Sequence, residues 1–128
     1  MHAAPPLHVM DWVGPVVGAA AFVLLMSRVR EPARRTANAM LVMGASGVYL
    51  SGGGFGPWEL LYPALAGPVA YLGLTSYRCI GLAWLMHAGW DAVHHLWGNP
   101  LWPFMATSSF GCLLFDTLIA MWLLAGAR

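Results

Sequence analysis

Four polar side chains that could do chemistry interrupt the apolar stretch 78–97: His87, Asp91, His94 and His95. At about 100° per residue, an α-helix places all four within one face about 100° wide. Imidazoles and carboxylates bind transition metals, act as acids and bases, and carry protons. The stretch therefore predicts a helix with one chemically active face.

Inserting that polar face into a membrane is energetically unfavourable. An Asp at the centre of a membrane span costs about 2.5–3.5 kcal/mol, whereas each large aliphatic residue returns about 0.3–0.6 kcal/mol. Asp91 therefore offsets about five aliphatic residues, and it needs a partner in a metal, a carboxylate, water or a second subunit. We expect a functional site on this helix.

A metal site is the first interpretation of the pattern. Asp91 is spaced i,i+3 from His94 and i,i+4 from His87 and His95, so neighbouring pairs can reach one ion. His87 and His95 lie about 12 Å apart along a helix, too far to share an ion. Either one ion binds near Asp91, or Asp91 bridges two ions. The predicted ligands of a divalent transition metal (zinc, iron, copper or manganese) are His87, Asp91, His94, His95 and Asp116, with Glu59 or Asp11 as further candidates.

Metal-free chemistry is the alternative for the same residues. Asp91, His87 and Asp116 are the candidate catalytic residues, because a buried carboxylic acid beside a base can protonate an isoprenoid-like substrate, as in an isomerase or cyclase. A proton or ion transporter or channel would use the same groups to move charge. A structural or assembly subunit of a membrane complex would use them only to join helices.

Composition favours an integral membrane protein with a single domain, residues 1–128. The chain is 59% hydrophobic and 9% charged, whereas soluble domains carry about 25% charged residues. A net charge of +1 and the absence of a basic patch argue against nucleic-acid binding. Cys79 and Cys112 are expected near opposite membrane faces, so we predict two free thiols.

The apolar segments predict an all-α bundle of five transmembrane helices, at 9–29, 36–51, 59–76, 78–97 and 104–126. Segment 59–76 contains two prolines, and if it dips in and returns, the chain crosses four times. The glycine-rich run at 51–58 lacks the Lys-Ser/Thr of a P-loop and is predicted to be a flexible outer loop.

The basic residues predict the orientation of this bundle. With five crossings and the N-terminus outside, every arginine lies on the cytoplasmic side, which indicates a multi-pass protein of the inner membrane. Tryptophans then fall at the outer interface. These residues are, in turn, Arg28, Arg30, Arg34, Arg35, Arg78 and Arg128, and Trp12, Trp58, Trp97 and Trp102.

Two resemblances follow from the residues at 87–112. The pattern H-x3-D-x2-H-H is similar to the His boxes of membrane di-iron desaturases and hydroxylases, but those use about eight histidines and this chain has five. The run H-A-G-W-D-A-V-H-H-L-W-G-N-P-L-W-P-F-M-A-T-S-S-F-G-C resembles the signature of an uncharacterised family of small bacterial multi-span membrane proteins. That resemblance implies an all-helical membrane architecture and no established activity.

The leading hypothesis is a membrane-embedded His/Asp metal-binding protein, in its most specific form an oxidoreductase acting on a lipophilic substrate. Its expected partners are the lipid bilayer and a lipophilic small molecule. Narrow, glycine-rich spans would gain burial from self-association, so we also expect a homo-oligomer.

Overall fold

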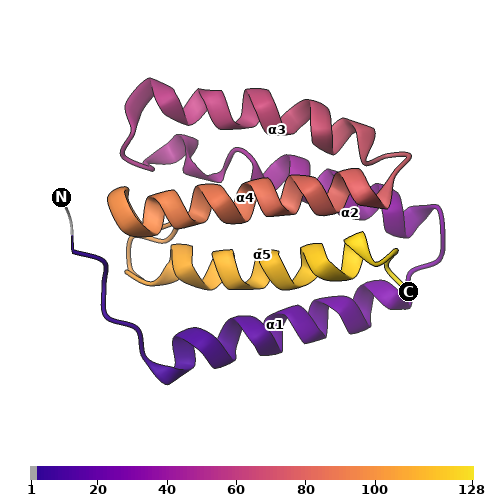
Figure 1. Cartoon of the computed structure of the whole chain (residues 1–128), viewed down its shortest axis with the longest axis horizontal. Helices are drawn as coiled ribbons and strands as arrows, with labels where there is room; N and C mark the ends of the chain where they lie inside the picture. The colour runs from indigo at the N-terminus through magenta and orange to yellow at the C-terminus, as the bar shows by residue number, and fades with distance from the viewer. Residues whose placement is uncertain (1–2) are drawn as a thin grey trace.

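A computed structural model describes residues 3–128 as a bundle of five α-helices with no strand within that range. The helices lie side by side along one direction, and each reverses the direction of the one before it (Figure 1). The predicted all-helical architecture is confirmed. The elements are α1 (Val9–Ser27), α2 (Ala33–Ala45), the 3-10 helices η1 (Val48–Ser51) and η2 (Gly56–Leu60), α3 (Leu61–Leu72), α4 (Tyr77–Trp97) and α5 (Ser108–Leu124).

Helix α4 is the centre of the bundle. It packs against α2, α3 and α5, whereas α1 packs mainly against α5. The α4–α5 contact is close because Gly81 has no side chain: a Cβ there would lie 2.7 Å from the Leu124 side chain. The core around this contact consists of apolar residues, among them Ile80, Ala83, Ile119 and Leu123.

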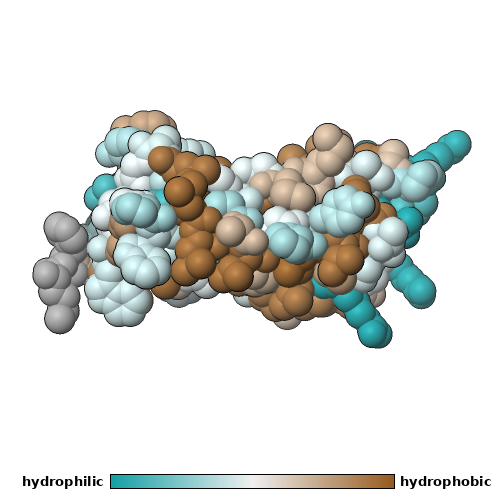
Figure 2. Space-filling model, turned by 90° about the horizontal axis from the view of Figure 1, so that it is seen from above, coloured by the Kyte–Doolittle hydropathy of each residue, from teal (hydrophilic) through white to brown (hydrophobic). Residues whose placement is uncertain are grey.

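The two ends of the bundle differ in character. Chain segments that carry arginines meet at the end where α1 turns into α2, α3 turns into α4, and the C-terminus lies (Figure 1). Arg34 donates there to the carbonyls of Ser27, Val29 and Ala127. Figure 2 shows hydrophilic side chains gathered at one end and hydrophobic ones over the middle. The segments that carry the predicted outer tryptophans lie at the opposite end: the start of α1, η2, the end of α4 and the loop before α5.

The helix lengths refine the predicted spans. Helix α1, 19 residues, is long and apolar enough to cross a membrane, and it is the one helix of residues 3–128 that meets both conditions. Helix α4 is longer but more polar, and α5 is apolar but has 17 residues. The expected spans 36–51 and 59–76 are shorter α-helices, each extended by a 3-10 helix, η1 or η2.

Both cysteines are free thiols, as predicted. Cys79 lies in the first turn of α4, at the arginine end, and Cys112 lies in the second turn of α5, near the other end. Neither takes part in the hydrogen bonds described below.

Candidate functional site

Three of the predicted site residues meet in the interior of the bundle. His87 Nδ1 lies 2.6 Å from Asp116 Oδ2 and 3.1 Å from Asp91 Oδ2. All three residues are buried, and Asp91 has no exposed surface. One ligand atom from each lies within 4.8 Å of the others. We call these three residues the inner cluster; α4 supplies His87 and Asp91, and α5 supplies Asp116.

The backbone of α2 fixes the orientation of the His87 ring. His87 Nε2 lies 2.8 Å from the carbonyl oxygen of Ala45, at the C-terminal end of α2. A carbonyl oxygen only accepts, so Nε2 must carry a hydrogen and donate it. Nδ1 then faces both carboxylates, either as a second N–H donor or as a lone pair toward a protonated acid.

A chain of hydroxyl groups continues from Asp91. Tyr49, on η1, donates its hydroxyl hydrogen to Asp91 Oδ1 at 2.6 Å, and its oxygen lies 2.8 Å from Ser109 Oγ. A tyrosine hydroxyl has one hydrogen, so Ser109 must donate back to Tyr49 when Asp91 is ionised. Ser109 in turn accepts from the Leu101 N–H at 3.0 Å. The inner cluster is therefore connected by hydrogen bonds to the loop before α5.

A second buried pair lies about two turns along α4. His94 Nε2 lies 3.0 and 3.1 Å from the two carboxylate oxygens of Glu59 on η2, and His94 Nδ1 donates to the Trp90 carbonyl at 2.8 Å. The Tyr49 ring stacks on the His94 ring with centroids 3.5 Å apart. We call His94 and Glu59 the outer pair. Tyr49 contacts both groups.

The glycine-rich run wraps the outer pair tightly. A Cβ at Gly53 would lie 2.0 Å from Glu59 Oε1 and 2.6 Å from His94 Nε2, so a larger residue there would force the loop or these side chains to move. The Gly53 carbonyl accepts from the Asn99 N–H at 2.8 Å, and the Asn99 side chain donates to the Gly52 carbonyl. These bonds attach the run, predicted as a flexible outer loop, to the turn that follows α4.

Comparison with known proteins identifies the family. The model of the "Family of unknown function (DUF6010)" matches residues 10–128. The chain belongs to this family. The match extends well beyond the run at 87–112 that carries the sequence resemblance, and it assigns no activity. No curated protein and no solved structure matches the chain.

The remaining predicted ligands lie apart from the inner cluster. His94 is paired with Glu59. His95 is half-buried against the Phe110 ring, with 5.5 Å between the ring centroids, and its Nδ1 has no hydrogen-bond partner among residues 3–128. Asp11, a further candidate, accepts from Thr107 and from the His8 N–H near the start of α1. The structure therefore brings together His87, Asp91 and Asp116, and separates them from His94, His95 and Asp11.

Three residues of this network were missing from the sequence prediction: Tyr49, Ser109 and Gly53. Glu59 was predicted only as an additional ligand, not as the partner of His94. Tyr49 follows a glycine-containing stretch with no helical periodicity, so the sequence carries no signal that its hydroxyl faces Asp91. A glycine triplet before an acidic residue was the one available signal for Gly53.

The inner cluster has the donor set and supporting contacts of a metal site. A ligating histidine usually donates its second ring N–H to a carbonyl or carboxylate, and ligating carboxylates are themselves hydrogen-bonded. His87 meets the first condition through Ala45 and Asp91 meets the second through Tyr49. The outer pair has a single carboxylate, both oxygens of which lie beside His94 Nε2, and Gly53 packs closely against it.

Proposed function

We propose that the chain is a multi-span membrane protein that binds one divalent transition metal ion through His87, Asp91 and Asp116. The observation that carries the proposal is the orientation of His87. Its Nε2 is tied to the Ala45 carbonyl, while its Nδ1 faces one oxygen from each of two buried aspartates. One imidazole cannot neutralise two carboxylates, and a divalent ion supplies the missing positive charge.

The distribution of residues supports a membrane location. Large apolar side chains on several helices face outward, including Leu25 at 66% exposure, Leu65 at 58% and Met121 at 62%. Soluble monomers rarely expose apolar surface on this scale. The arginine-bearing segments share one end, and the segments with the predicted outer tryptophans share the other. This is the pattern expected for five crossings with the arginines in the cytoplasm.

The inner cluster needs only a small adjustment to accept an ion. Ligand atoms about 2.0–2.1 Å from a tetrahedral ion lie roughly 3.3 Å apart. The His87–Asp91 separation of 3.1 Å is close to this value, and the His87–Asp116 separation of 2.6 Å must open by about 0.7 Å. A rotation of the Asp116 side chain would open this distance.

The ligand types indicate a borderline or hard metal. One imidazole and two carboxylates suit zinc, iron or manganese better than a thiophilic ion such as copper(I). Three protein ligands also leave coordination positions open, which is typical of metal centres that bind a small molecule or carry out a reaction. An oxidoreductase that acts on a lipophilic substrate is the enzyme class that combines such a centre with a membrane setting.

Elemental analysis of the purified full chain tests the proposal. We expect one metal ion per chain, and stoichiometric loss in His87→Asn and Asp91→Asn. His95→Asn is the matched control, because His95 lies on the same helix outside the inner cluster. Retention of metal in both cluster variants, or metal-free protein after supplementation with zinc, iron and manganese, would overturn the metal assignment.

Proton transfer is the second candidate, favoured by one observation. Hydrogen bonds form an unbroken series from the start of α5 into the bundle interior. The series runs through Ser109, Tyr49, Asp91, His87 and Asp116. A metal on Nδ1 would displace the hydrogen shared by His87 and Asp116, so the two functions exclude each other in one state. Proton uptake by metal-free vesicles, lost in Tyr49→Phe, would favour this candidate.

A further inference from the structure

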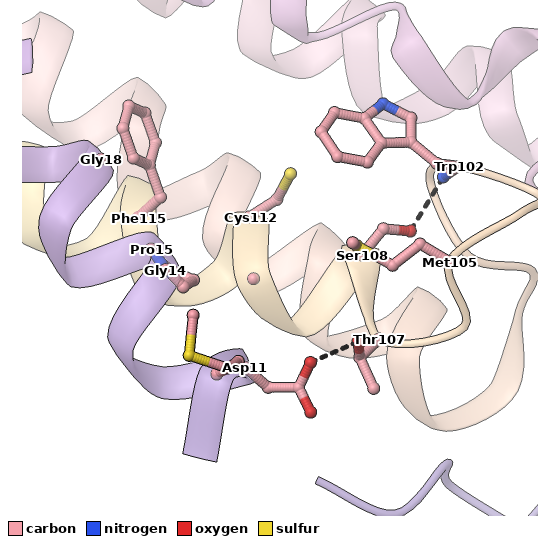
Figure 3. Close-up of a pocket in the computed structure, with 12 residues that line it drawn as sticks. Asp11, Gly14, Pro15, Gly18, Trp102, Met105, Thr107, Ser108, Cys112 and Phe115 are labelled. Atoms are coloured by element: carbon pink, nitrogen blue, oxygen red, sulfur yellow. Dashed lines mark hydrogen bonds between the residues drawn. The ribbon is translucent and has the colours of Figure 1, made fainter. Parts of the chain in front are cut away.

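A cavity of about 630 Å³ lies between α1 and α5, apart from the inner cluster. Figure 3 shows the residues that line it, from both helices and from the loop before α5. On each helix the lining residues recur every three or four positions, so the cavity follows one face of each helix for about two turns, roughly 12 Å.

Small residues create this cavity. Gly14, Gly18 and Gly111 line it, and a Cβ at Gly14 would meet no atom within 4 Å. At Gly18 a Cβ would lie 3.7 Å from Phe115, which closes the inner end. The space is thus shaped by missing side chains and by one aromatic ring. Its wall is almost wholly apolar.

One charged group lies at the outer end of the cavity. Asp11 accepts from Thr107 Oγ1 at 2.6 Å (Figure 3). It also accepts from the His8 N–H at 2.7 Å. A carboxylate offers about four lone-pair sites, so two remain free. Within residues 3–128 no basic side chain, histidine included, lies within 4.0 Å of Asp11 to form an ion pair. The arginine-bearing segments lie at the other end of the bundle.

We propose that this cavity binds a single-chain amphiphile with a cationic head, taken from the outer leaflet. The head would pair with Asp11, and the chain would lie along Gly14 and Gly18 toward Phe115. That orientation matches the membrane setting, because Asp11 is in the first turn of α1 and the apolar end lies deeper in the bilayer. The unpaired carboxylate favours a cationic head over a neutral or anionic one.

The inference takes from the proposed function only the membrane setting and the outward N-terminus. It is independent of the metal site. Two glycines provide matched variants. Gly14→Leu is designed to fill the cavity, since a Cβ at Gly14 would meet no atom within 4 Å. Gly89→Leu adds the same side chain at an exposed position on α4, where a Cβ would also meet no atom within 4 Å. Gly111→Val is a second filling variant, for use if Gly14→Leu does not fold.

Photolabelling of the full chain in maltoside micelles tests the proposal. The probes are dodecyltrimethylammonium and dodecyl sulfate, each with a diazirine near the chain end, and adducts are mapped by mass spectrometry. We expect the ammonium probe to label peptides of α1 and α5 about fivefold more than the sulfate probe, the range of one partly exposed ion pair.

Labelling of the variants shows whether the probe's head group pairs with Asp11 and whether its chain lies in the cavity. Asp11→Asn should abolish the preference for the ammonium head, Gly14→Leu should abolish labelling by both probes, and Gly89→Leu should change neither. Asp91→Asn should also keep full labelling, which separates this result from failure of the metal site. Equal labelling by the two heads, labelling that survives both filling variants, or adducts that join two copies of the chain would overturn the proposal.

Discussion

The inner cluster and the outer pair are both buried histidine–carboxylate groups on α4, yet they are built differently. In the outer pair one carboxylate gives both oxygens to one imidazole, and Gly53 packs directly against it. In the inner cluster one imidazole faces two carboxylates that come from different helices. The outer pair has one imidazole for one carboxylate and is closely packed, which suits a structural role in joining η2 to α4. The inner cluster carries a surplus acid, which suits ion binding.

Removing one member of the outer pair should have the largest effect. His94→Ala leaves the Glu59 carboxylate buried, with only the Phe55 N–H beside it. Loss of one partner of a buried pair typically costs about 3–5 kcal/mol. We expect this decrease in the free energy of unfolding, measured by reversible denaturation in micelles. A loss below about 1 kcal/mol would show that the outer pair is not a structural link.

A substitution at Gly53, which packs against the outer pair, should lower the free energy of unfolding by less. Gly53→Ala places a Cβ 2.0 Å from Glu59 Oε1, so either the loop or the carboxylate must move. Overpacking of this kind typically costs about 1–3 kcal/mol. Gly89→Ala is the control, because open space surrounds that position. Equal stability of the two variants would mean that the loop does not close on the pair.

Tyr49→Phe sharpens the comparison, because Tyr49 touches both groups. The variant keeps the ring that stacks on His94 and removes the hydroxyl that donates to Asp91. We expect a loss of about 1–2 kcal/mol and about 10–100-fold weaker metal binding, measured by competition with a chelator. Tyr62→Phe is the matched control, since the buried Tyr62 hydroxyl has no hydrogen-bond partner. Unchanged metal affinity in Tyr49→Phe would show that the Tyr49 hydroxyl does not support metal binding by the inner cluster.

Asp116→Asn should separate stability from function. It removes the surplus negative charge and leaves His87 paired with Asp91, so we expect the free energy of unfolding of the metal-free protein to change by less than about 1 kcal/mol. Metal binding should nevertheless weaken by at least about tenfold, since a ligand is lost. Destabilisation as large as that of His94→Ala would instead make the inner cluster a second structural link.

The smallest effect is expected at His95. Its ring packs beside Phe110 without a hydrogen bond to Nδ1. His95→Ala should therefore change stability by about 0.5–1 kcal/mol and leave the metal content unchanged. Loss of metal in this variant would restore the wider ligand set that the sequence predicts.

The sequence predicted the helix that carries the site and much of the inner cluster. The cost of Asp91 in an apolar segment signalled a specific partner, and the spacing of His87 and Asp91 placed both on one face of α4. The presence of Asp116 in the last apolar segment completed the set. These inferences depend on helix periodicity and on the cost of burying charge, both of which are local properties of the chain.

The other features of the site depend on contacts between distant segments, which the sequence pattern does not predict. His94 and His95 point about 100° apart around α4, and only the neighbouring elements decide that His94 meets Glu59 whereas His95 meets Phe110. Tyr49 reaches Asp91 because α2 is followed by η1, a 3-10 turn that no periodic pattern in the sequence predicts. The second helix therefore ends at Ala45, before η1, and the third begins only after η2, at Leu61.

The place of α4 in the order of the chain has a consequence for biosynthesis. Ala45, Tyr49 and Glu59 all precede α4, so three of the groups that satisfy its histidines and Asp91 are already translated when that helix leaves the ribosome. Helix α1 has the opposite situation: its main neighbour, α5, arrives last. Only Ala19 of α1 is buried in the finished bundle, and in the proposed membrane setting such a helix can stay in contact with lipid until α5 emerges.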